Sequence, residues 1–367
     1  MDRDFRVFQN RSCCKLRQIQ KKAHHNNNLD LISVAKKLLE EMGLSGDVTL
    51  ERLVGGRNNQ VFKVMVNDQR FLLKSYFVHE NDPRDRLGNE FTFLRFAWDK
   101  GIRCIPQPLT ADKKQHVALY EFVEGERLKE SDITEDFIKQ AISFVLELNK
   151  YKNTDEAINL PFASEACFSI GEHLNCVERR LRRLCEIDPC DSVSKNAHDF
   201  IQRELIPCWL TMKKNIFEKL GNSDNAINEV IDNNERCLSP SDFGFHNALL
   251  KKSGILRFID FEYAGWDDPA KLICDFICQP ELPVSETYGL QLMEEVIMSF
   301  DQPKPIKQRA ERLLLLYRFK WCCILLNEFR AEDRQRRLHA GLDSENLLGQ
   351  QCDKAKQYFT KHLTYLA

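Results

Sequence analysis

The residues whose types and spacing could do chemistry are concentrated in one stretch of the second half of the chain. Asp242 is followed five positions later by Asn247, and Asp260 lies beyond two apolar runs, 248–250 and 256–259, which predict a short hairpin. That hairpin would bring Asp260 back beside Asn247. In kinase-type phosphoryl transfer, one loop carboxylate accepts the proton of the substrate hydroxyl, while an amide and a second carboxylate hold the Mg²⁺ that bridges the nucleotide phosphates. The alternative is an ordinary hairpin with turn-forming Asp and Asn side chains.

The assignment of roles depends on the register, because residues 242–244 read Asp-Phe-Gly, the metal-binding tripeptide of protein kinases. If Asp242 were the metal ligand, an upstream carboxylate should have an amide five positions after it. Neither Asp224 nor Asp232 has one. The spacing therefore favours Asp242 as the catalytic base and Asn247 with Asp260 as the metal ligands.

The composition is that of an ordinary globular protein. The 367 residues are 43% hydrophobic and 29% charged, which is enough for an ample core in two lobes or domains. A net charge of -2 indicates no general attraction to nucleic acid or to anionic membranes. The most apolar stretch, 313–326, is interrupted by Arg318 and Lys320, so no membrane span is expected. We therefore expect a soluble, cytoplasmic protein; its oligomeric state remains open.

The ends of the chain and its cysteines suggest no extracellular framework. Residues 1–28 are polar and basic without the apolar centre of a secretory signal, and they are expected to form a mobile tail. A basic arm that contacts nucleic acid or anionic lipid is the alternative. The fourteen cysteines are scattered and lack the paired C-x-x-C spacing of a structural zinc site, so we expect reduced thiols.

Residues 29–123 are predicted to form a nucleotide-binding lobe. A helix over 29–43 is followed by strands at 48–53, 61–66 and 71–77. The first two strands are separated by a loop that contains Gly55, Gly56, Asn58 and Asn59. Glycines allow close approach of the backbone, and the amides of such a turn can point at phosphate. A plain hairpin turn would also explain this loop.

Lys74 is an unusual charge in the third strand, because apolar side chains surround it in the sequence. A helix predicted over 84–100 has an apolar stripe formed by Leu87, Phe91, Leu94 and Trp98, and Glu90 lies beside that stripe. The order of Lys74 and Glu90 matches the ion pair that kinases use to align phosphates. The alternative is that both side chains are exposed.

A further strand over 117–123 is expected to offer the backbone of Glu121 and Val123 to an adenine ring. The composition then becomes helix-rich, which predicts a catalytic and substrate-binding lobe over 124–367. The predicted helices of this lobe are 135–150, 168–185, 193–220, 270–278, 285–300, 305–329 and 344–365. Four arginines, Arg179, Arg180, Arg182 and Arg183, are interpreted as a solvated helix face, with anion recognition as the alternative.

Taken together, these features resemble the aminoglycoside phosphotransferase and choline kinase-like family of small-molecule kinases, over about residues 48–329. The residues that carry the resemblance are Asp242 with Asn247, the run from Ile259 to Trp266 with Asp268, Pro269 and Asp275, Lys74 with Glu90, and the run from Tyr120 to Gly125. The resemblance implies an α+β, two-lobed protein kinase-like fold, in which a small antiparallel β-sheet lobe with one helix adjoins a larger, mainly helical lobe. It also implies ATP between the lobes, Mg²⁺, and a small hydroxyl acceptor against the helices. Pro240 stands where the family usually has a His that braces the loop.

Three functions are compatible with these residues. An active small-molecule kinase explains the presence of all five candidate residues, which are Lys74, Glu90, Asp242, Asn247 and Asp260. An inactive kinase-like nucleotide-binding module would be expected to lack at least one of them. A protein kinase is disfavoured because the full glycine-rich pattern and the A-P-E segment are missing. ATP is expected, and GTP is not excluded. The acceptor is left open, although Glu262, Asp267 and Asp268 with Tyr263 and Trp266 could favour a cationic amino alcohol or amino sugar, or could be structural.

Overall fold

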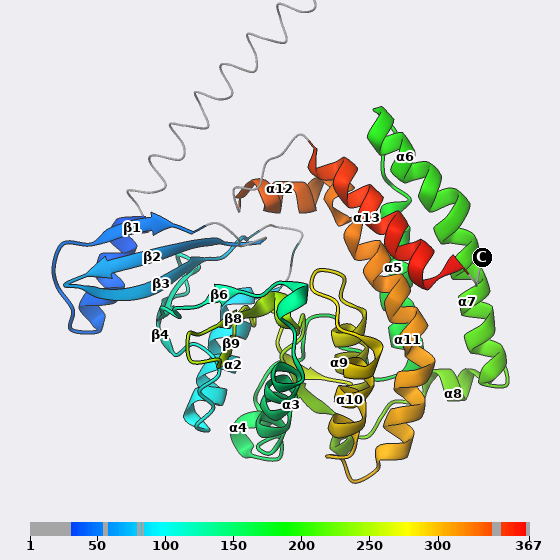
Figure 1. The fold of residues 1–367 in the computed structure, drawn as a ribbon, viewed down its shortest axis with the longest axis horizontal. Coiled ribbons are helices and arrows are strands. Elements are labelled where there is room, and N and C mark those ends of the chain that lie inside the picture. Colours follow the sequence, from blue (N-terminus) through cyan, green and yellow to red (C-terminus); the bar gives the residue numbers. More distant parts are fainter. Residues whose placement is uncertain (1–30, 54–57, 79–81, 83, 340–345, 365–367) are drawn as a thin grey trace, which may run out of the picture.

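The computed structural model describes residues 31–364 except 54–57, 79–81, 83 and 340–345. The expected tail and both Gly55 and Gly56 therefore lie outside the described residues. The remainder forms a small lobe built on a β-sheet and a larger lobe built mainly of helices (Figure 1). This is the mixed α+β architecture that the sequence predicts.

The small lobe contains one antiparallel sheet of five strands in the order β1-β2-β3-β5-β4. The strands are β1 Thr49–Arg52, β2 Gln60–Val66, β3 Gln69–Ser75, β4 Pro108–Asp112 and β5 Val117–Glu121. Asn67 and Asp68 have φ of 46° and 62°, the left-handed conformation that a two-residue hairpin turn needs between β2 and β3. The sequence analysis missed β4, whose alternation is short and interrupted by an irregular register.

Successive residues of the strands point to opposite faces, and each face has its own helix. On one face Leu38 and Leu39, from a helix over 31–41, pack with Phe62 and Leu73. On the other face Ala118 and Tyr120 join the core that contains Leu87 and Leu94 of α2 (Arg86–Asp99). The sheet is therefore covered on both sides, and α2 lies on the side of the larger lobe.

Helix α2 begins where Asp85 accepts a hydrogen bond from the Gly88 amide at 2.8 Å, which caps its first turn. Leu87 and Leu94 are buried as predicted, whereas Phe91 and Trp98 are only half-buried because Phe93, Phe96 and Ala97 occupy the core face. Glu90 is 3% exposed. The prediction was therefore correct for Leu87 and Leu94 and for the position of Glu90 beside the apolar face, and wrong for Phe91 and Trp98.

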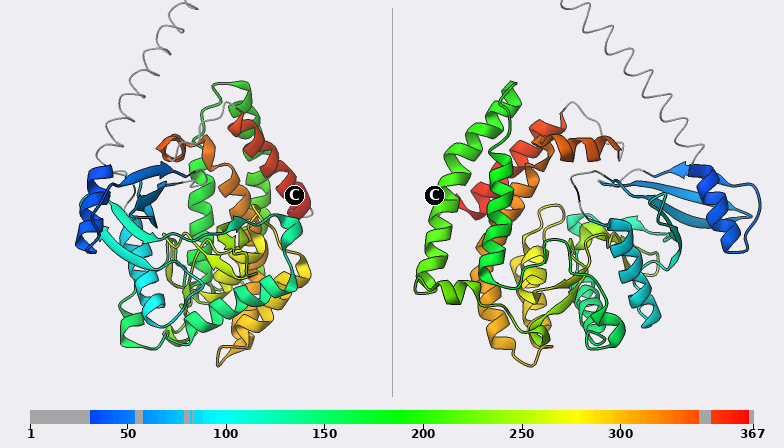
Figure 2. Two further views of the ribbon diagram at one scale, coloured as in Figure 1. Left: turned by 60° about the vertical axis from the view of Figure 1, so that its left-hand side comes forward. Right: turned by 180° about the vertical axis from the view of Figure 1, so that it is seen from behind.

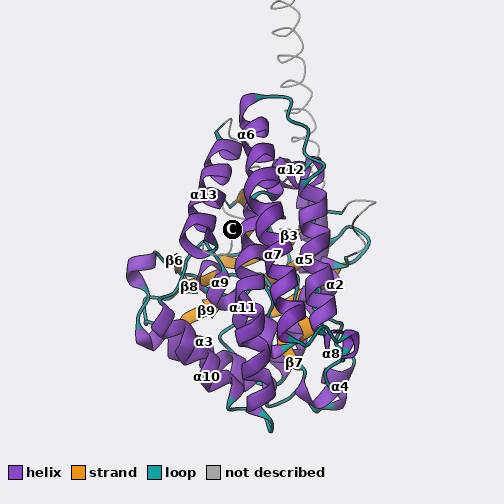
Figure 3. Ribbon diagram, turned by 90° about the vertical axis from the view of Figure 1, so that its right-hand side faces the viewer, coloured by secondary structure: helices purple, strands orange, loops and turns teal. Residues whose placement is uncertain are grey.

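The larger lobe is organised around α9 (Pro269–Cys278), all of whose residues are buried. The long helix α11 packs along it, and α5, α10 and α13 pack on α11 in turn (Figures 2 and 3). The other helices are α3 Glu135–Asn149, α4 Asp155–Ile158, α5 Ile170–Leu184, α6 Ser192–Phe200, α7 Ile206–Lys219, α8 Asp224–Asn228, α10 Glu286–Ile297, α11 Pro303–Leu325, α12 Ala331–His339 and α13 Leu347–His362. The helix predicted over 193–220 is α6 and α7 joined by a π-helical turn, Ile201–Leu205.

Two small sheets support the loops of this lobe. One pairs β7 (Cys237–Ser239) with β10 (Gly265–Asp267), and the other has the order β6-β8-β9, with β6 Glu126–Arg127, β8 Ala248–Leu250 and β9 Leu256–Phe258. No helix in the described part of the chain is long and apolar enough to cross a membrane. All twelve cysteines of the described residues are free thiols.

Candidate active site

The predicted hairpin is confirmed. Ala248 pairs with Phe258 across β8 and β9, and the Ile259 amide donates to the Asn247 carbonyl at 2.9 Å. Asp260 follows at φ 70°, a left-handed conformation that turns its side chain out of the strand direction. The hairpin therefore holds Asn247 and Asp260 next to each other, as their spacing in the sequence predicts.

Asp242 is held in a strained loop that Asn247 closes. Ser241 and Asp242 have φ of 49° and 37°, and Asn247 Nδ2 donates to the Asp242 carbonyl at 2.9 Å and to its Oδ2 at 3.4 Å. With Nδ2 engaged in this way, Oδ1 of Asn247 is the atom that would meet a cation. The amide of Ser241 donates to Ser239 Oγ at 3.1 Å, so local polar contacts brace the loop where Pro240 replaces the usual His.

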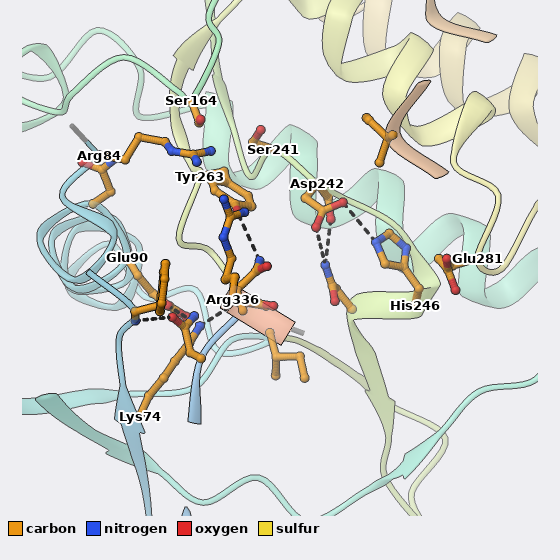
Figure 4. Close-up of a pocket in the computed structure, with 18 of the residues that line it drawn as sticks. Lys74, Arg84, Glu90, Ser164, Ser241, Asp242, His246, Tyr263, Glu281 and Arg336 are labelled. Atoms are coloured by element: carbon orange, nitrogen blue, oxygen red, sulfur yellow. Dashed lines mark hydrogen bonds and ion pairs between the residues drawn. The ribbon is translucent and has the colours of Figure 1, made fainter. Parts of the chain in front are cut away.

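His246 also contacts Asp242, and the sequence analysis did not single it out. Its Nε2 lies 3.3 Å from Asp242 Oδ1, and only 15% of its side chain is exposed. The only signal in the sequence was a histidine four positions after the candidate base. Figure 4 shows the imidazole pointing toward Asp242, with Glu281 on its far side.

Lys74 and Glu90 form the predicted ion pair, and Asp260 joins them. Lys74 Nζ lies 2.6 Å from Glu90 Oε2 and 2.6 Å from Asp260 Oδ1 (Figure 4). Glu90 also accepts hydrogen bonds from the Tyr76 hydroxyl at 2.7 Å and from the Phe261 amide at 3.2 Å. The β3 strand, α2 and the segment after β9 are thereby tied together at one point.

This cluster has a characteristic charge distribution. Burial by itself lowers the pKa of Lys74, but the carboxylates of Asp260 and Glu90 outweigh it and hold that pKa well above its usual value. Burial and the neighbouring Glu262 and Glu90 raise the pKa of Asp260 to about 6, against the opposing effect of Lys74. Lys74 therefore stays cationic, which is the state needed to attract phosphate.

Asn58 and Asn59 lie against the cavity, but their side-chain amides are already engaged. Asn58 Nδ2 donates to Glu262 Oε1 at 2.6 Å and to the Tyr263 hydroxyl at 3.0 Å, and Asn59 Nδ2 donates to Glu262 Oε2 at 2.6 Å. These bonds attach the loop between β1 and β2 to the large lobe. A role of this loop in nucleotide binding would depend on its backbone and not on these two amide groups.

Glu121 and Val123 line the same cavity at the junction of the lobes. The Glu121 carboxylate accepts from Arg257 Nη2 at 2.6 Å and from the Gln107 amide at 3.1 Å, so its side chain fixes the junction to β9. Its backbone amide donates to the Gln107 carbonyl at 2.9 Å, and β5 ends at this residue. A planar base could therefore meet the Glu121 carbonyl and the backbone beyond it, which includes Val123.

The cavity between the lobes has a volume of about 1400 Å³. Lys74 of the small lobe lines it together with Asp242, Asn247 and Asp260, which come from one stretch of the large lobe. A space of this size exceeds the 300–1,000 Å³ that is typical of a single small-molecule site. It can accommodate a nucleotide and a second small molecule together.

The acidic residues considered for a cationic acceptor do not face this cavity. Glu262, Asp267 and Asp268 are no more than 1% exposed. Glu262 is bound by Asn58 and Asn59, Asp267 by Lys271, and Asp268 by Arg309 and His173. Trp266 does not line the cavity either, and Tyr263 does. The structural alternative is therefore correct for the three acids, because each satisfies a buried base or amide.

The arginine cluster is likewise only partly a solvated face. Arg182 is exposed and pairs with Glu178, as expected for a solvated residue. Arg180 is instead half-buried and pairs with Glu165, while Arg179 and Arg183 are exposed but line the cavity. The helix α5 thus turns one part of this cluster to the site.

The donors present fit a Mg²⁺ ion. Asp260 Oδ2 and Asn247 Oδ1 are oxygen ligands, the type that Mg²⁺ prefers, and Mg²⁺ at phosphate sites is usually held by one or two carboxylates plus substrate phosphates. Among the described residues no three His, Cys, Asp or Glu side chains form a metal site of their own. With a Mg²⁺ ion bound here, the protein would supply two ligands and leave the other positions to phosphate and water.

The chain is similar in sequence to one protein family and in fold to several solved structures. Residues 49–277 match the model of the phosphotransferase enzyme family. No curated protein sequence matches the chain significantly. Among solved structures, an ethanolamine kinase from Plasmodium vivax has a TM-score of 0.58 at 15% identity and covers 91% of this chain and 89% of that one.

Two further structures have the same fold. A choline kinase from Streptococcus pneumoniae has a TM-score of 0.56 at 13% identity, with 90% of this chain and 99% of that one covered. An ADP-bound aminoglycoside phosphotransferase has a TM-score of 0.53 at 16% identity, with 89% and 97% covered. These similarities establish the protein kinase-like fold, and the family model spans more than half of the chain. The chain therefore belongs to the phosphotransferase enzyme family and is a small-molecule kinase.

Proposed function

We propose that the protein transfers the γ-phosphoryl group of ATP to a hydroxyl group of a small molecule. The observation that carries this proposal is the convergence of Asp242, Asn247 and the Lys74–Glu90–Asp260 cluster on one cavity. The ADP-bound aminoglycoside phosphotransferase and the choline and ethanolamine kinases, which share the fold, support a nucleotide and a small acceptor in that cavity.

Different residues of the chain bind the nucleotide and activate the acceptor hydroxyl. Lys74, held by Glu90, binds the nucleotide phosphates, and the backbone of Glu121 and Val123 binds the base. Asp242 orients the acceptor hydroxyl and takes its proton as the acceptor oxygen bonds to the γ-phosphorus. The bond between that phosphorus and the β,γ-bridging oxygen breaks, and ADP leaves. Bound Mg²⁺, held by Asn247 and Asp260, would neutralise the phosphate charge.

An inactive nucleotide-binding module is the second candidate function. It would bind ATP with the same lysine and carboxylates but would not need an oriented base. The two bonds by which Asn247 fixes the Asp242 loop, together with the contact from His246, favour the enzyme. A loop without a catalytic role would not require a carboxylate held in a strained backbone conformation.

Substitution of the two carboxylates tests the assigned roles. Asp242→Asn should lower acceptor-dependent ADP release by roughly 10² to 10⁴, the usual contribution of a general base, and leave Mg²⁺-dependent ATP binding unchanged. Asp260→Asn should weaken both, because this residue meets the metal. Calorimetric titration of ATP with and without Mg²⁺ measures the binding. If Asp242→Asn abolishes Mg²⁺-dependent binding and Asp260→Asn preserves it, the two roles are reversed.

A further inference from the structure

Arginines from three separate segments line the cavity, one in the small lobe and two in the helical lobe. Arg84 precedes α2, Arg179 and Arg183 lie on α5, and Arg336 lies on α12. Figure 4 shows the side chain of Arg84 reaching toward Tyr263, and Arg336 between the Lys74–Glu90 pair and Asp242. The acceptor must reach Asp242 through this environment, so its charge should complement these side chains.

The carboxylates in this part of the cavity are mostly neutralised. Asp82, Glu165, Asp275, Glu281 and Asp333 each form an ion pair with a lysine or arginine. A carboxylate already paired with a base attracts a second cation only weakly, because the two protein charges largely cancel. These acids therefore do not provide the negative site that an amino alcohol or amino sugar would need.

Arg179 and Arg183 differ from their neighbours on α5. They are four residues apart, so they project from the same helix face, and neither forms an ion pair with any other described residue. Glu186, just after the helix, lines the cavity beside these two arginines, and it forms no ion pair with any other described residue. Two unpaired guanidinium groups and one unpaired carboxylate therefore line this part of the cavity, which gives it a net positive charge.

The aromatic side chains do not form a cage for a quaternary ammonium. The guanidinium of Arg84 lies 5.6 Å from the centre of the Tyr263 ring and occupies the cation–π position. Trp321 is buried and donates its indole N–H to Asp275 at 2.9 Å. Phe162 remains exposed, but a single ring does not enclose a cation.

We propose, building on the phosphotransferase function above, that the acceptor is an anionic polyol. Its reacting hydroxyl lies at Asp242, and its carboxylate or phosphate group is bound by Arg179 and Arg183. The hydroxyl groups of Ser164 and Ser241, which line the same cavity, suit a polyhydroxylated body. The transfer balances as described above: the acceptor hydroxyl loses its proton to Asp242 and gains the γ-phosphoryl group, while ATP becomes ADP.

A panel of acceptors of different charge tests this proposal. ADP release is measured with Mg²⁺-ATP and gluconate, glucose 6-phosphate, glucose, ethanolamine or choline, so that carboxylate, phosphate, neutral and cationic acceptors are compared. A charge-assisted hydrogen bond is roughly a tenfold effect or more in binding, so we expect kcat/KM for gluconate or glucose 6-phosphate to exceed that for glucose by at least about tenfold. Preference for gluconate or for glucose 6-phosphate distinguishes the two anionic groups.

Three variants should change the KM of an anionic acceptor, the two arginine variants in one direction and the glutamate variant in the other, and a fourth serves as the control. Arg179→Gln and Arg183→Gln should each raise the KM of the anionic acceptor by about tenfold and leave the KM for ATP unchanged, because only acceptor binding is altered. Glu186→Gln should lower the KM of the same acceptor. Arg182→Gln is the matched control on α5, since Arg182 pairs with Glu178 outside the cavity, and it should change neither value.

The outcomes separate this proposal from the proposed function. Efficient transfer to choline or ethanolamine, with KM raised by Glu186→Gln, would overturn the anionic acceptor and leave the kinase function intact. If no acceptor releases ADP, gluconate and glucose 6-phosphate are titrated calorimetrically into the protein with Mg²⁺-ADP. Absence of binding that depends on Arg179 and Arg183 then overturns the acceptor proposal, whereas absence of Mg²⁺-dependent ATP binding overturns the kinase function itself.

Discussion

Replacement of Lys74 by methionine should separate the structural from the catalytic role of the buried ion cluster. Lys74 Nζ is 2.6 Å from oxygens of both Glu90 and Asp260, so these two carboxylates lie within roughly 5 Å of each other. At that separation two like charges in an effective dielectric of about 20 repel by about 3 kcal/mol. Because the Lys74→Met variant removes the cation between them, we expect its free energy of unfolding to fall by about 3 kcal/mol, the lower end of the range for a broken buried pair.

A second substitution should restore part of this stability but none of the activity. Glu90→Gln removes one of the two carboxylates, so the Lys74→Met/Glu90→Gln double variant should be more stable than Lys74→Met alone, with a coupling energy of about 1–3 kcal/mol. Acceptor-dependent ADP release should be severely reduced in both variants, because no cation remains to align the phosphates. Urea unfolding followed by circular dichroism and an assay at saturating ATP measure the two properties.

Arg70→Met provides the matched control on the same strand. Arg70 pairs with Glu124 at the surface, where both side chains are largely exposed, so its loss should change the free energy of unfolding by less than about 1 kcal/mol. If Lys74→Met is no less stable than Arg70→Met, or if the effects of Lys74→Met and Glu90→Gln simply add, the electrostatic argument is wrong. Unchanged turnover of Lys74→Met at saturating ATP would refute the phosphate-binding role.

Three further predictions concern the stability of the fold. Asp268→Asn should lower the free energy of unfolding by about 3–5 kcal/mol, because Arg309 Nε at 2.7 Å and His173 Nε2 at 3.2 Å would lose their buried anion. Urea unfolding measures this, and a decrease below about 1 kcal/mol would contradict it. Although burial opposes it, Arg180 holds the pKa of Glu165 down to about 2, below its usual value of about 4.5. The ion pair therefore contributes its whole stabilisation above about pH 5, and this contribution is lost as the pH falls toward 2. The difference in free energy of unfolding between the wild type and Glu165→Gln should shrink over that interval. A difference that does not depend on pH would exclude this pairing. Because all described cysteines are free, a reducing agent should leave the melting temperature unchanged, and a large decrease would indicate a structural disulfide.

The sequence alone was sufficient for the parts of the site that depend on local pattern. The spacing of Asp242 and Asn247, the hairpin that returns Asp260, and the strand and helix that present Lys74 and Glu90 all follow from short-range periodicity and turn chemistry. These signals are local because a hairpin or a helix face is determined by residues a few positions apart. The same reasoning correctly predicted the α+β fold with two lobes. It missed β4, which is short and irregular in register, and α12, whose sequence is mostly polar.

The tertiary structure alone decided which charged side chains line the cavity. Glu262 and Asp268 look like candidate ligands in the sequence, but residues distant in the sequence bind and bury them. Asn59 binds Glu262 from 203 positions away, and Arg309 and His173 bind Asp268 from 41 and 95 positions away. Arg179 and Arg183 look like an ordinary solvated face, yet the packing of α5 places them on the cavity. The burial and pairing of a charge depend on which distant segment packs against it, and local sequence pattern carries no information about that contact.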